Sequence, residues 1–292
     1  MLKVALPQLG GGLPEAVSAR QILARERAVR RIITFSPDLD GILGGGVAVG
    51  QITEFCGVPG VGKTQLGMQL AINVQLPAAF AGTGGEAVYI DTEGSFTPGR
   101  CAQMADSFCA HLAKVAAQRG DPARLEAAAA TTRDGILGRI HLLRARDHVE
   151  QLAAVDALPA LLDARPGVRL VVVDSVTFHF RQDYADLGAR TRQLGQMAQR
   201  LMAAAGDRQV AVVLMNQVTT KVGAAGEVAR LVPALGDSWA HAATSRVILY
   251  WQGASRRAFV YKSPSQPAAE AEYRVTAEGI RGKRPPKRPA PG

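Results

Sequence analysis

The sequence predicts an α/β fold in which a mostly parallel sheet is flanked by helices and continued by an antiparallel C-terminal extension. First, a glycine-rich loop at 57–64 lies between an apolar segment and a helical pattern without proline. Second, apolar strand candidates rich in valine and isoleucine alternate with helical patterns, which is typical of parallel sheets buried on both faces. Third, the strand candidates after residue 244 are joined by turns rather than helices, which favours antiparallel pairing.

Hydrophobic periodicity assigns the elements in chain order. The predicted parallel strands span 51–56, 87–91, 140–143, 170–174 and 210–215, and the later strands span 245–251, 257–262 and 272–276. The predicted helices span 65–75, 101–118, 152–162 and 190–205. We expect an N-terminal arm at 1–30, a core at 31–280 and a basic, proline-rich, disordered tail at 281–292.

Length and composition limit the class of protein. With 292 residues, 47% of them hydrophobic, the chain can bury the core of one domain of about 250 residues but not a second large one. No apolar run approaches the roughly 18–20 residues that cross a bilayer, and the N-terminus lacks a signal-peptide pattern. We therefore expect a soluble intracellular protein without a membrane partner. The three cysteines lack metal-binding spacing, so we expect reduced thiols.

The net charge of +9 suits a polyanionic partner, but five positive side chains lie in residues 281–292. Four prolines are interleaved with them in the same segment. A basic cluster of this kind is compatible with nuclear import, with phosphate contact or with a purely solubilising role. The sequence leaves these three interpretations of the tail open.

The loop at 57–64 has the composition and spacing of a phosphate-binding loop. Its glycines allow the backbone to turn successive N–H groups inward, and the following helix directs the positive end of its dipole toward the same point. We expect Lys63 to meet the outer phosphates and Thr64 to offer its hydroxyl to Mg²⁺. The predicted site for a nucleoside triphosphate and Mg²⁺ comprises Gly57, Val58, Pro59, Gly60, Val61, Gly62, Lys63, Thr64 and Gln65.

Three polar side chains follow the ends of predicted strands, where open α/β sheets bind ligands. Asp174 ends a strongly apolar strand and is the candidate that orients Mg²⁺ through water. Glu93 follows a second strand and is the candidate base that positions a water molecule, although a structural role competes. Gln217 follows a third strand, where its amide can donate to the terminal phosphate and report its presence.

The glycine-rich loop, the segments 89–94 and 173–175, and the pair Asn216 and Gln217 resemble, in this order, the RecA-like recombinases of eukaryotes and archaea. The resemblance covers residues 32–280, and several further segments are most similar to the C-type paralogues of the strand-exchange recombinase. It implies a RecA-like P-loop ATPase core that binds ATP at the interface between neighbouring subunits.

The resemblance also implies roles for residues outside the loop. Arg100 matches an arginine that stacks on adenine, and His241 matches a residue that approaches the terminal phosphate bound by the adjoining subunit. Residues 261–267, including Lys262 and Pro267, match a segment that caps a neighbour's nucleotide. The sequence departs from the family pattern at Lys262, where an acidic residue is usual, which changes the charge at the subunit boundary.

Two loops that follow the strands ending at Asp174 and Gln217 line the DNA path in this family. In the first loop, the aromatic and cationic groups of Phe180, Arg181 and Tyr184 are the expected contacts with DNA. In the second loop they are Lys221 and Arg230. Without the resemblance, the same charges would be interpreted as solvated side chains.

The leading hypothesis is a subunit that binds ATP and Mg²⁺, hydrolyses ATP slowly and assists recombinase filaments on single-stranded or branched DNA in repair. Because the chain shows neither a separate N-terminal helix–hairpin–helix pattern nor a Phe-x-x-Ala motif, we expect a hetero-oligomer with other recombinase paralogues and the recombinase itself. The expected location is the nucleus, with the cytoplasm left open. A structural scaffold with negligible turnover and a RecA-type motor are the alternatives.

Overall fold

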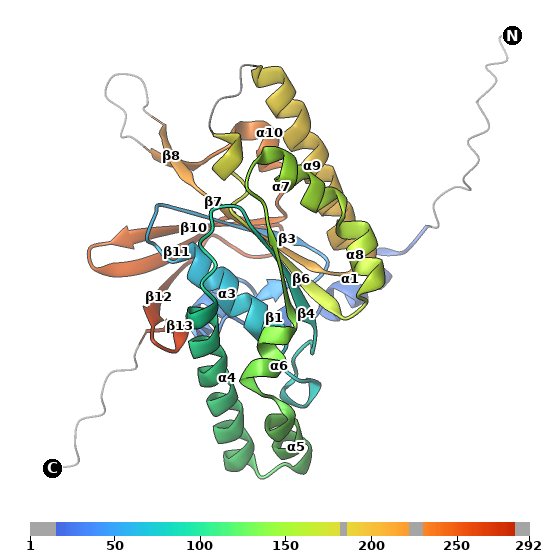
Figure 1. The fold of residues 1–292 in the computed structure, drawn as a ribbon, viewed down its shortest axis with the longest axis vertical. Coiled ribbons are helices and arrows are strands. Elements are labelled where there is room, and N and C mark those ends of the chain that lie inside the picture. Colours follow the sequence, from blue (N-terminus) through green and yellow to red (C-terminus); the bar gives the residue numbers. More distant parts are fainter. Residues whose placement is uncertain (1–15, 182–185, 222–229, 284–292) are drawn as a thin grey trace, which may run out of the picture.

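The computed structural model describes residues 16–181, 186–221 and 230–283. In this part of the chain, a nine-stranded sheet with the order β13-β12-β11-β10-β3-β7-β6-β4-β5 lies at the centre of the molecule (Figure 1). Its strands are β3 Ile52–Gly57, β4 Glu86–Asp91, β5 Ile140–Arg144, β6 Val168–Asp174, β7 Ala211–Asn216, β10 Ser245–Gln252, β11 Ser255–Lys262, β12 Glu270–Thr276 and β13 Gly279–Gly282.

The strand directions confirm the predicted fold class. Strands β10, β3, β7, β6, β4 and β5 pair in parallel, and β11, β12 and β13 extend the sheet beyond β10 in antiparallel pairs. Strand β13 has no counterpart among the strands predicted from the sequence, and it runs through Arg281 and Gly282 into the segment where we expected the tail to begin. Residues 284–292 lie outside the described part of the chain.

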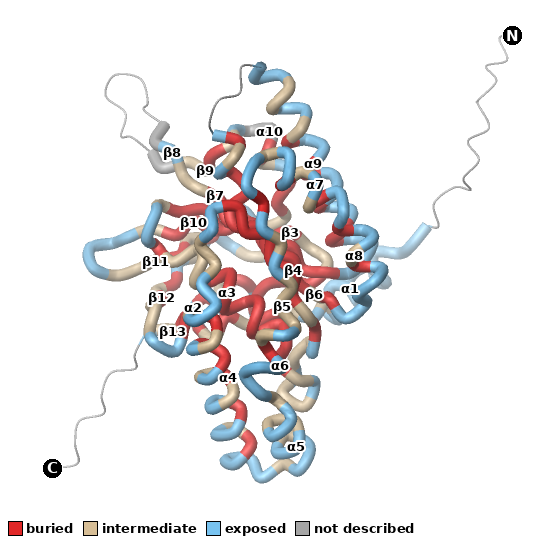
Figure 2. Tube along the Cα trace, viewed as in Figure 1, coloured by how far each residue is buried: buried red, intermediate tan, exposed pale blue. Residues whose placement is uncertain are grey.

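Helices cover both faces of the sheet because successive strand residues point to opposite sides. In β4, Tyr89 belongs to the apolar cluster formed with helices α3 Lys63–Asn73, α4 Pro98–Arg119 and α6 Arg133–Gly138. The neighbouring Val88 and Ile90 belong to the cluster formed with α7 His148–Asp156, α8 Leu158–Ala164, α9 Leu187–Arg208 and α10 Gly236–Ala240. Figure 2 shows this buried centre, and α5 Pro122–Ala130 lies beside the far end of α4.

One predicted helix is wrong in detail. The segment 152–162 was expected to form a single helix, but α7 ends at Asp156 and α8 begins at Leu158. Pro159 lies in the first turn of α8, where its missing N–H costs no helical hydrogen bond. Within a continuous helix the same proline would remove a hydrogen bond and clash with the preceding turn.

Several short elements have weak signals in the sequence. They are α1 Ala19–Arg27, β1 Arg31–Ile32, α2 Pro37–Ile42, β2 Val47–Ala48, the 3₁₀ turns Ala78–Phe80 and Phe178–Phe180, and the antiparallel pair β8 Val218–Lys221 and β9 Arg230–Pro233. Helix α1 buries none of its side chains. Among the described residues, no helix combines the length and apolar character needed to span a bilayer.

Candidate functional site

The glycine-rich loop connects the buried strand β3 to helix α3, and its glycines serve different geometric needs. A Cβ on Gly57 would lie 2.7 Å from the carbonyl oxygen of Leu249 in β10, so Gly57 permits the close approach of two strands. Gly60 and Gly62 have φ angles of 76° and 107°, which side chains with a Cβ rarely adopt. The loop therefore turns tightly and directs the first N–H groups of α3 into its concave side.

Lys63, the first residue of α3, reaches back into this loop. Its Nζ donates hydrogen bonds to the carbonyl oxygens of Gly57 at 2.8 Å and Val58 at 3.1 Å. Burial lowers the pKa of Lys63, while the nearby carboxylates of Asp174 and Glu93 oppose that change. The amine is thus held by the loop near two acidic groups, and as a cation it suits a charge-assisted hydrogen bond to a phosphate.

Asp174 ends β6 beside the start of α3. It is 2% exposed, and its Oδ2 accepts a hydrogen bond of 2.8 Å from the Tyr89 hydroxyl. Burial raises the pKa of Asp174 to about 6, although hydrogen bonds from Thr64 and Tyr89 act in the opposite direction. The Thr64 hydroxyl also lies 3.4 Å from the Ser95 hydroxyl. Hydroxyl and carboxylate oxygens are the ligands that Mg²⁺ prefers, so the residues present fit this ion.

Glu93 and Gln217 lie at the same edge of the sheet. The Gln217 Nε2 donates to the Glu93 Oε1 at 3.4 Å, and the Arg181 guanidinium donates to the Gln217 Oε1. The structure therefore connects the expected base, the expected phosphate sensor and the first loop expected to contact DNA through consecutive side-chain contacts. The sequence did not predict the contact between Arg181 and Gln217, because it depends on how two loops meet.

Asp91 fixes the loop that carries Glu93, a role that the sequence analysis missed. Its Oδ1 accepts hydrogen bonds from the backbone N–H groups of Gly94 at 2.8 Å and Ser95 at 3.1 Å. Its Oδ2 pairs with Arg144 at 2.7 Å. The sequence signal is an aspartate followed three residues later by glycine, since aspartate side chains accept hydrogen bonds from the backbone that follows.

Arg100 and Gln65 are in contact, although the sequence placed them in different elements. The Arg100 Nε donates to the Gln65 Oε1 at 2.8 Å, and the remaining guanidinium nitrogens donate to the carbonyl oxygens of Thr276 and Ala277. Arg100 therefore joins α3, α4 and the turn between β12 and β13. Its role at adenine, implied by the resemblance, stays a prediction.

His241 and Lys262, both expected at a subunit boundary, lie close together in one chain. His241 is exposed and follows α10. The Lys262 Nζ donates to the carbonyl oxygens of Ala240 at 2.9 Å and Ala243 at 2.7 Å. Burial lowers the pKa of Lys262, and the charge of Arg246 adds to the effect. Lys262 thus holds the segment that presents His241.

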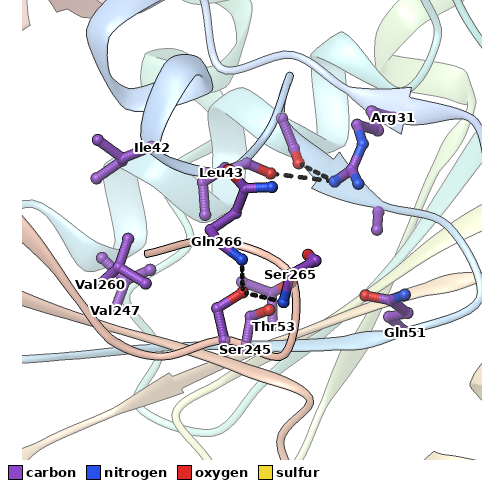
Figure 3. Close-up of a pocket in the computed structure, with 13 residues that line it drawn as sticks. Arg31, Ile42, Leu43, Gln51, Thr53, Ser245, Val247, Val260, Ser265 and Gln266 are labelled. Atoms are coloured by element: carbon purple, nitrogen blue, oxygen red, sulfur yellow. Dashed lines mark hydrogen bonds between the residues drawn. The ribbon is translucent and has the colours of Figure 1, made fainter. Parts of the chain in front are cut away.

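The cap segment packs on the core at one side of a small pocket (Figure 3). Gln266 lies against Gly44, where an added Cβ would be 2.6 Å from the Gln266 amide nitrogen. Arg31 donates to the carbonyl oxygens of Leu43 and Gly46, which flank this glycine in the chain. The pocket of about 10 Å³ has room for about one water molecule, so it positions the cap rather than holding a nucleotide. Pro267 is exposed just beyond it.

The expected DNA contacts differ in their exposure and position. Arg181 is exposed, whereas Phe180 is 1% exposed and packs in the core with α7 and α9. We therefore correct the assignment of Phe180, because a ring buried in the core cannot stack on a base. Lys221 and Arg230 are paired by register across the β8–β9 ladder. Tyr184 lies outside the described residues.

A hollow of about 480 Å³ lies between the two loops that were expected to contact DNA. Its lining includes Arg181, Arg190 of α9 and Thr219 of β8. The Arg190 Nε is held by the carbonyl oxygen of Phe180 at 2.6 Å. The hollow therefore combines two guanidinium groups with an open surface, a composition that suits phosphate groups.

Comparisons with known proteins agree with this architecture. The model of the Rad51 family matches residues 25–119 and 121–283. Over 264 residues the chain is 45% identical to the DNA repair protein RAD51 homolog 3 of Cricetulus griseus. This match covers 90% of this chain and 72% of that protein. Over 266 residues it is 39% identical to the protein of the same name from Dictyostelium discoideum, and this match covers 91% of this chain and 69% of that protein. On this evidence of matched length and identity, the chain belongs to the Rad51 family.

Proposed function

We propose that this chain is an ATPase subunit of a recombinase-paralogue complex that acts in homologous recombination and double-strand-break repair. Proteins of the Rad51 family generally bind ATP with Mg²⁺ and hydrolyse ATP. Two relatives at 45% and 39% identity carry the name DNA repair protein RAD51 homolog 3, which supports the assignment to the C-type paralogues. The proposed partners are single-stranded or branched DNA, other paralogues and the recombinase, in the nucleus.

The observation that carries the proposal is the meeting of Lys63, Thr64, Asp174, Glu93 and Gln217 at one edge of the sheet. Asp174, Glu93 and Gln217 lie at the ends of the neighbouring parallel strands β6, β4 and β7, where α/β proteins bind their ligands. Lys63 and Thr64 begin helix α3 beside them. The cationic amine and the N–H groups of the loop suit the phosphates of ATP. The Thr64 and Asp174 oxygens would hold Mg²⁺, which when bound neutralises charge on the phosphate oxygens.

In this proposal Glu93 orients and polarises the attacking water, while Gln217 contacts the terminal phosphate. Phosphoryl transfer depends mainly on such positioning and on electrostatic stabilisation. The contact of Gln217 with Arg181 allows DNA to affect the ATP site. A DNA phosphate that binds Arg181 competes with the Gln217 amide oxygen for the guanidinium and so releases the Gln217 side chain. Hydrolysis that is slow without DNA and faster with it is the expected behaviour.

Phosphate release by the parent protein and by Glu93→Gln, with and without single-stranded DNA, tests the proposed activity. Glu126→Gln, which alters an exposed glutamate in α5, is the matched control. We expect release by the parent and by the control to rise with DNA, and release by Glu93→Gln to fall by 100-fold or more, on the order of the effect of a general base. Parent protein that assembles with its partners without measurable release would identify a structural scaffold and contradict the proposed ATPase.

A further inference from the structure

A buried ionic cluster lies behind the phosphate-binding loop. At its centre is Glu54, which is fully buried in β3, three residues before Gly57. The Glu54 Oε1 accepts hydrogen bonds from the Asn216 Nδ2 at 2.7 Å and from the Trp239 Nε1 at 2.9 Å. Its Oε2 pairs with the guanidinium of Arg246 in β10, whose side chain is 4% exposed. One carboxylate thus connects β3, β7, β10 and α10.

Such a cluster is costly as a source of stability alone. The effective penalty for burying a charge is several kcal/mol, and apolar side chains of similar volume often stabilise a core better. Two of its polar atoms, the Asn216 Oδ1 and the Arg246 Nη2, have no hydrogen-bond partner among the described residues. The cluster therefore holds unused hydrogen-bonding capacity beside a shared acceptor, so that a change in one bond changes the others.

The residues bound to Glu54 adjoin the residues of the proposed ATP site. Asn216 immediately precedes Gln217 and also donates to the carbonyl oxygen of Ala234 at 3.2 Å, next to β9. Trp239 lies two residues before His241 in α10, and Lys262 donates to the carbonyl oxygens of Ala240, the last residue of that helix, and of Ala243 beyond it. A shift of Gln217 toward a phosphate would move Asn216, and the oxygen that Asn216 shares with Trp239 would transmit the change to α10.

We propose that Glu54 is a positioning residue that couples nucleotide in the phosphate-binding loop to the end of β7 and to α10, and that Trp239 senses this coupling. The inference rests on the proposed function, because it requires that the loop bind ATP. Beyond the proposed function, Glu54 would connect the nucleotide bound by this chain to the segment of the same chain that presents His241. Occupancy of one site would thereby alter the surface that a neighbouring subunit meets.

The chain offers a direct optical test because it contains two tryptophans, Trp239 and Trp251. Trp251 is 41% exposed in β10, far along the hairpin from the cluster, with the Arg256 guanidinium 4.2 Å from its ring centre. In the full chain carrying Trp251→Phe, all tryptophan emission comes from Trp239. We expect a non-hydrolysable ATP analogue with Mg²⁺ to change this emission, with a midpoint equal to that of analogue binding measured by equilibrium dialysis.

Two further variants in the Trp251→Phe background separate coupling from binding. Lys63→Ala should abolish both the binding and the emission change. Asn216→Ala should leave the dissociation constant within about threefold of the parent value, while the emission change falls at least fivefold, because one of the two donors to the shared oxygen is lost.

The outcomes distinguish the inference from the proposed function on which it rests. Analogue binding in dialysis without a change in Trp239 emission would overturn the coupling and leave ATP binding intact. An emission change of full size in Asn216→Ala would also overturn the coupling through Glu54. Absence of analogue binding to the Trp251→Phe chain in dialysis would overturn the proposed function and the inference together.

Discussion

At the scale of single residues, the hydrogen bond from the Tyr89 hydroxyl lowers the pKa of the buried Asp174 carboxyl. We expect Tyr89→Phe to lower the free energy of unfolding by about 1–2 kcal/mol, because a buried carboxylate loses a donor. The same loss raises the pKa of Asp174 further, so a higher Mg²⁺ concentration should be needed for half-maximal ATP binding at pH 6.5. Urea unfolding and an Mg²⁺ titration of ATP binding measure the two effects.

Thr131→Val is the control, since its hydroxyl donates to the carbonyl oxygen of Ala127 at 2.7 Å at the end of α5, and neither residue belongs to the proposed site. It removes a hydroxyl and should leave the Mg²⁺ concentration for half-maximal binding unchanged. An equal shift in Mg²⁺ dependence for both variants would contradict the role assigned to Tyr89.

Arg181 is the residue through which we expect DNA to reach the ATP site. Arg181→Gln should weaken binding to single-stranded DNA about 3- to 10-fold and reduce the slope of log K against log salt by about 0.7, as one lost phosphate contact requires. Arg119→Gln, at the exposed end of α4, should leave both quantities unchanged. If fluorescence anisotropy titrations at several salt concentrations gave equal effects for the two substitutions, the proposed contact between Arg181 and DNA would be wrong.

At the scale of elements, the loop between β3 and α3 depends on two different properties of glycine. Gly57→Ala should lower the free energy of unfolding by about 2–3 kcal/mol, because its Cβ would overlap the backbone of β10. Gly60→Ala should cost about 1 kcal/mol, since nothing lies within 4 Å of the added Cβ and only the positive φ opposes it. Denaturant unfolding in which Gly60→Ala is the more damaging change would contradict this explanation.

Helix α2 makes stability depend on pH through Asp40. Its Oδ1 accepts a hydrogen bond from the Thr34 N–H at 2.7 Å, and burial raises the pKa of Asp40 from 3.8 to about 6. The folded chain therefore binds more protons than the unfolded chain between these values, and stability falls as pH rises through the window. The contribution is up to about 3 kcal/mol.

The matched variant Asp40→Asn keeps the acceptor for Thr34 but has no carboxyl group to ionise. The unfolding free energy of the parent relative to this variant should decrease between about pH 4 and pH 6 and stay constant above about pH 7. If the unfolding free energies of the parent and of Asp40→Asn changed with pH by the same amount in urea unfolding, Asp40 would not be the cause of the pH dependence of stability.

The elements and the site differ in how far the sequence predicts them. The parallel strands and the residues at their ends, such as Asp174 and Glu93, have local signals because a buried strand is a continuous apolar run that is followed by an acidic side chain. The sequence cannot reveal that Phe180 is buried, since this depends on how α7 and α9 pack over it.

Glu54 illustrates the same limit for polar residues. It lies within an apolar strand, and its partners Trp239 and Arg246 are 185 and 192 positions away along the chain. No periodicity connects residues at such separations, because only the folded sheet places β3 beside β10. Likewise, Lys262 was expected at a subunit boundary from its position in the cap, whereas its contacts within the chain became visible only with α10 in place.

At the scale of the whole molecule, the proposed hydrolysis and the proposed coupling through Glu54 depend on ATP bound in the loop at 57–64. The site draws on both sections of the sheet, since Tyr273 of the antiparallel section holds Val61 and Tyr89 of the parallel section holds Asp174. ATP should therefore stabilise the folded molecule as one unit, by an amount that grows with the logarithm of its concentration.

An equilibrium titration of the full chain with ATP in the presence of Mg²⁺ tests this central claim most directly, with Lys63→Ala and the exposed-lysine control Lys114→Ala measured in parallel. We predict saturable binding with one ATP per chain for the parent and for Lys114→Ala, and at least 100-fold weaker binding for folded Lys63→Ala. Binding of equal strength by Lys63→Ala, or none by the folded parent, would contradict the account.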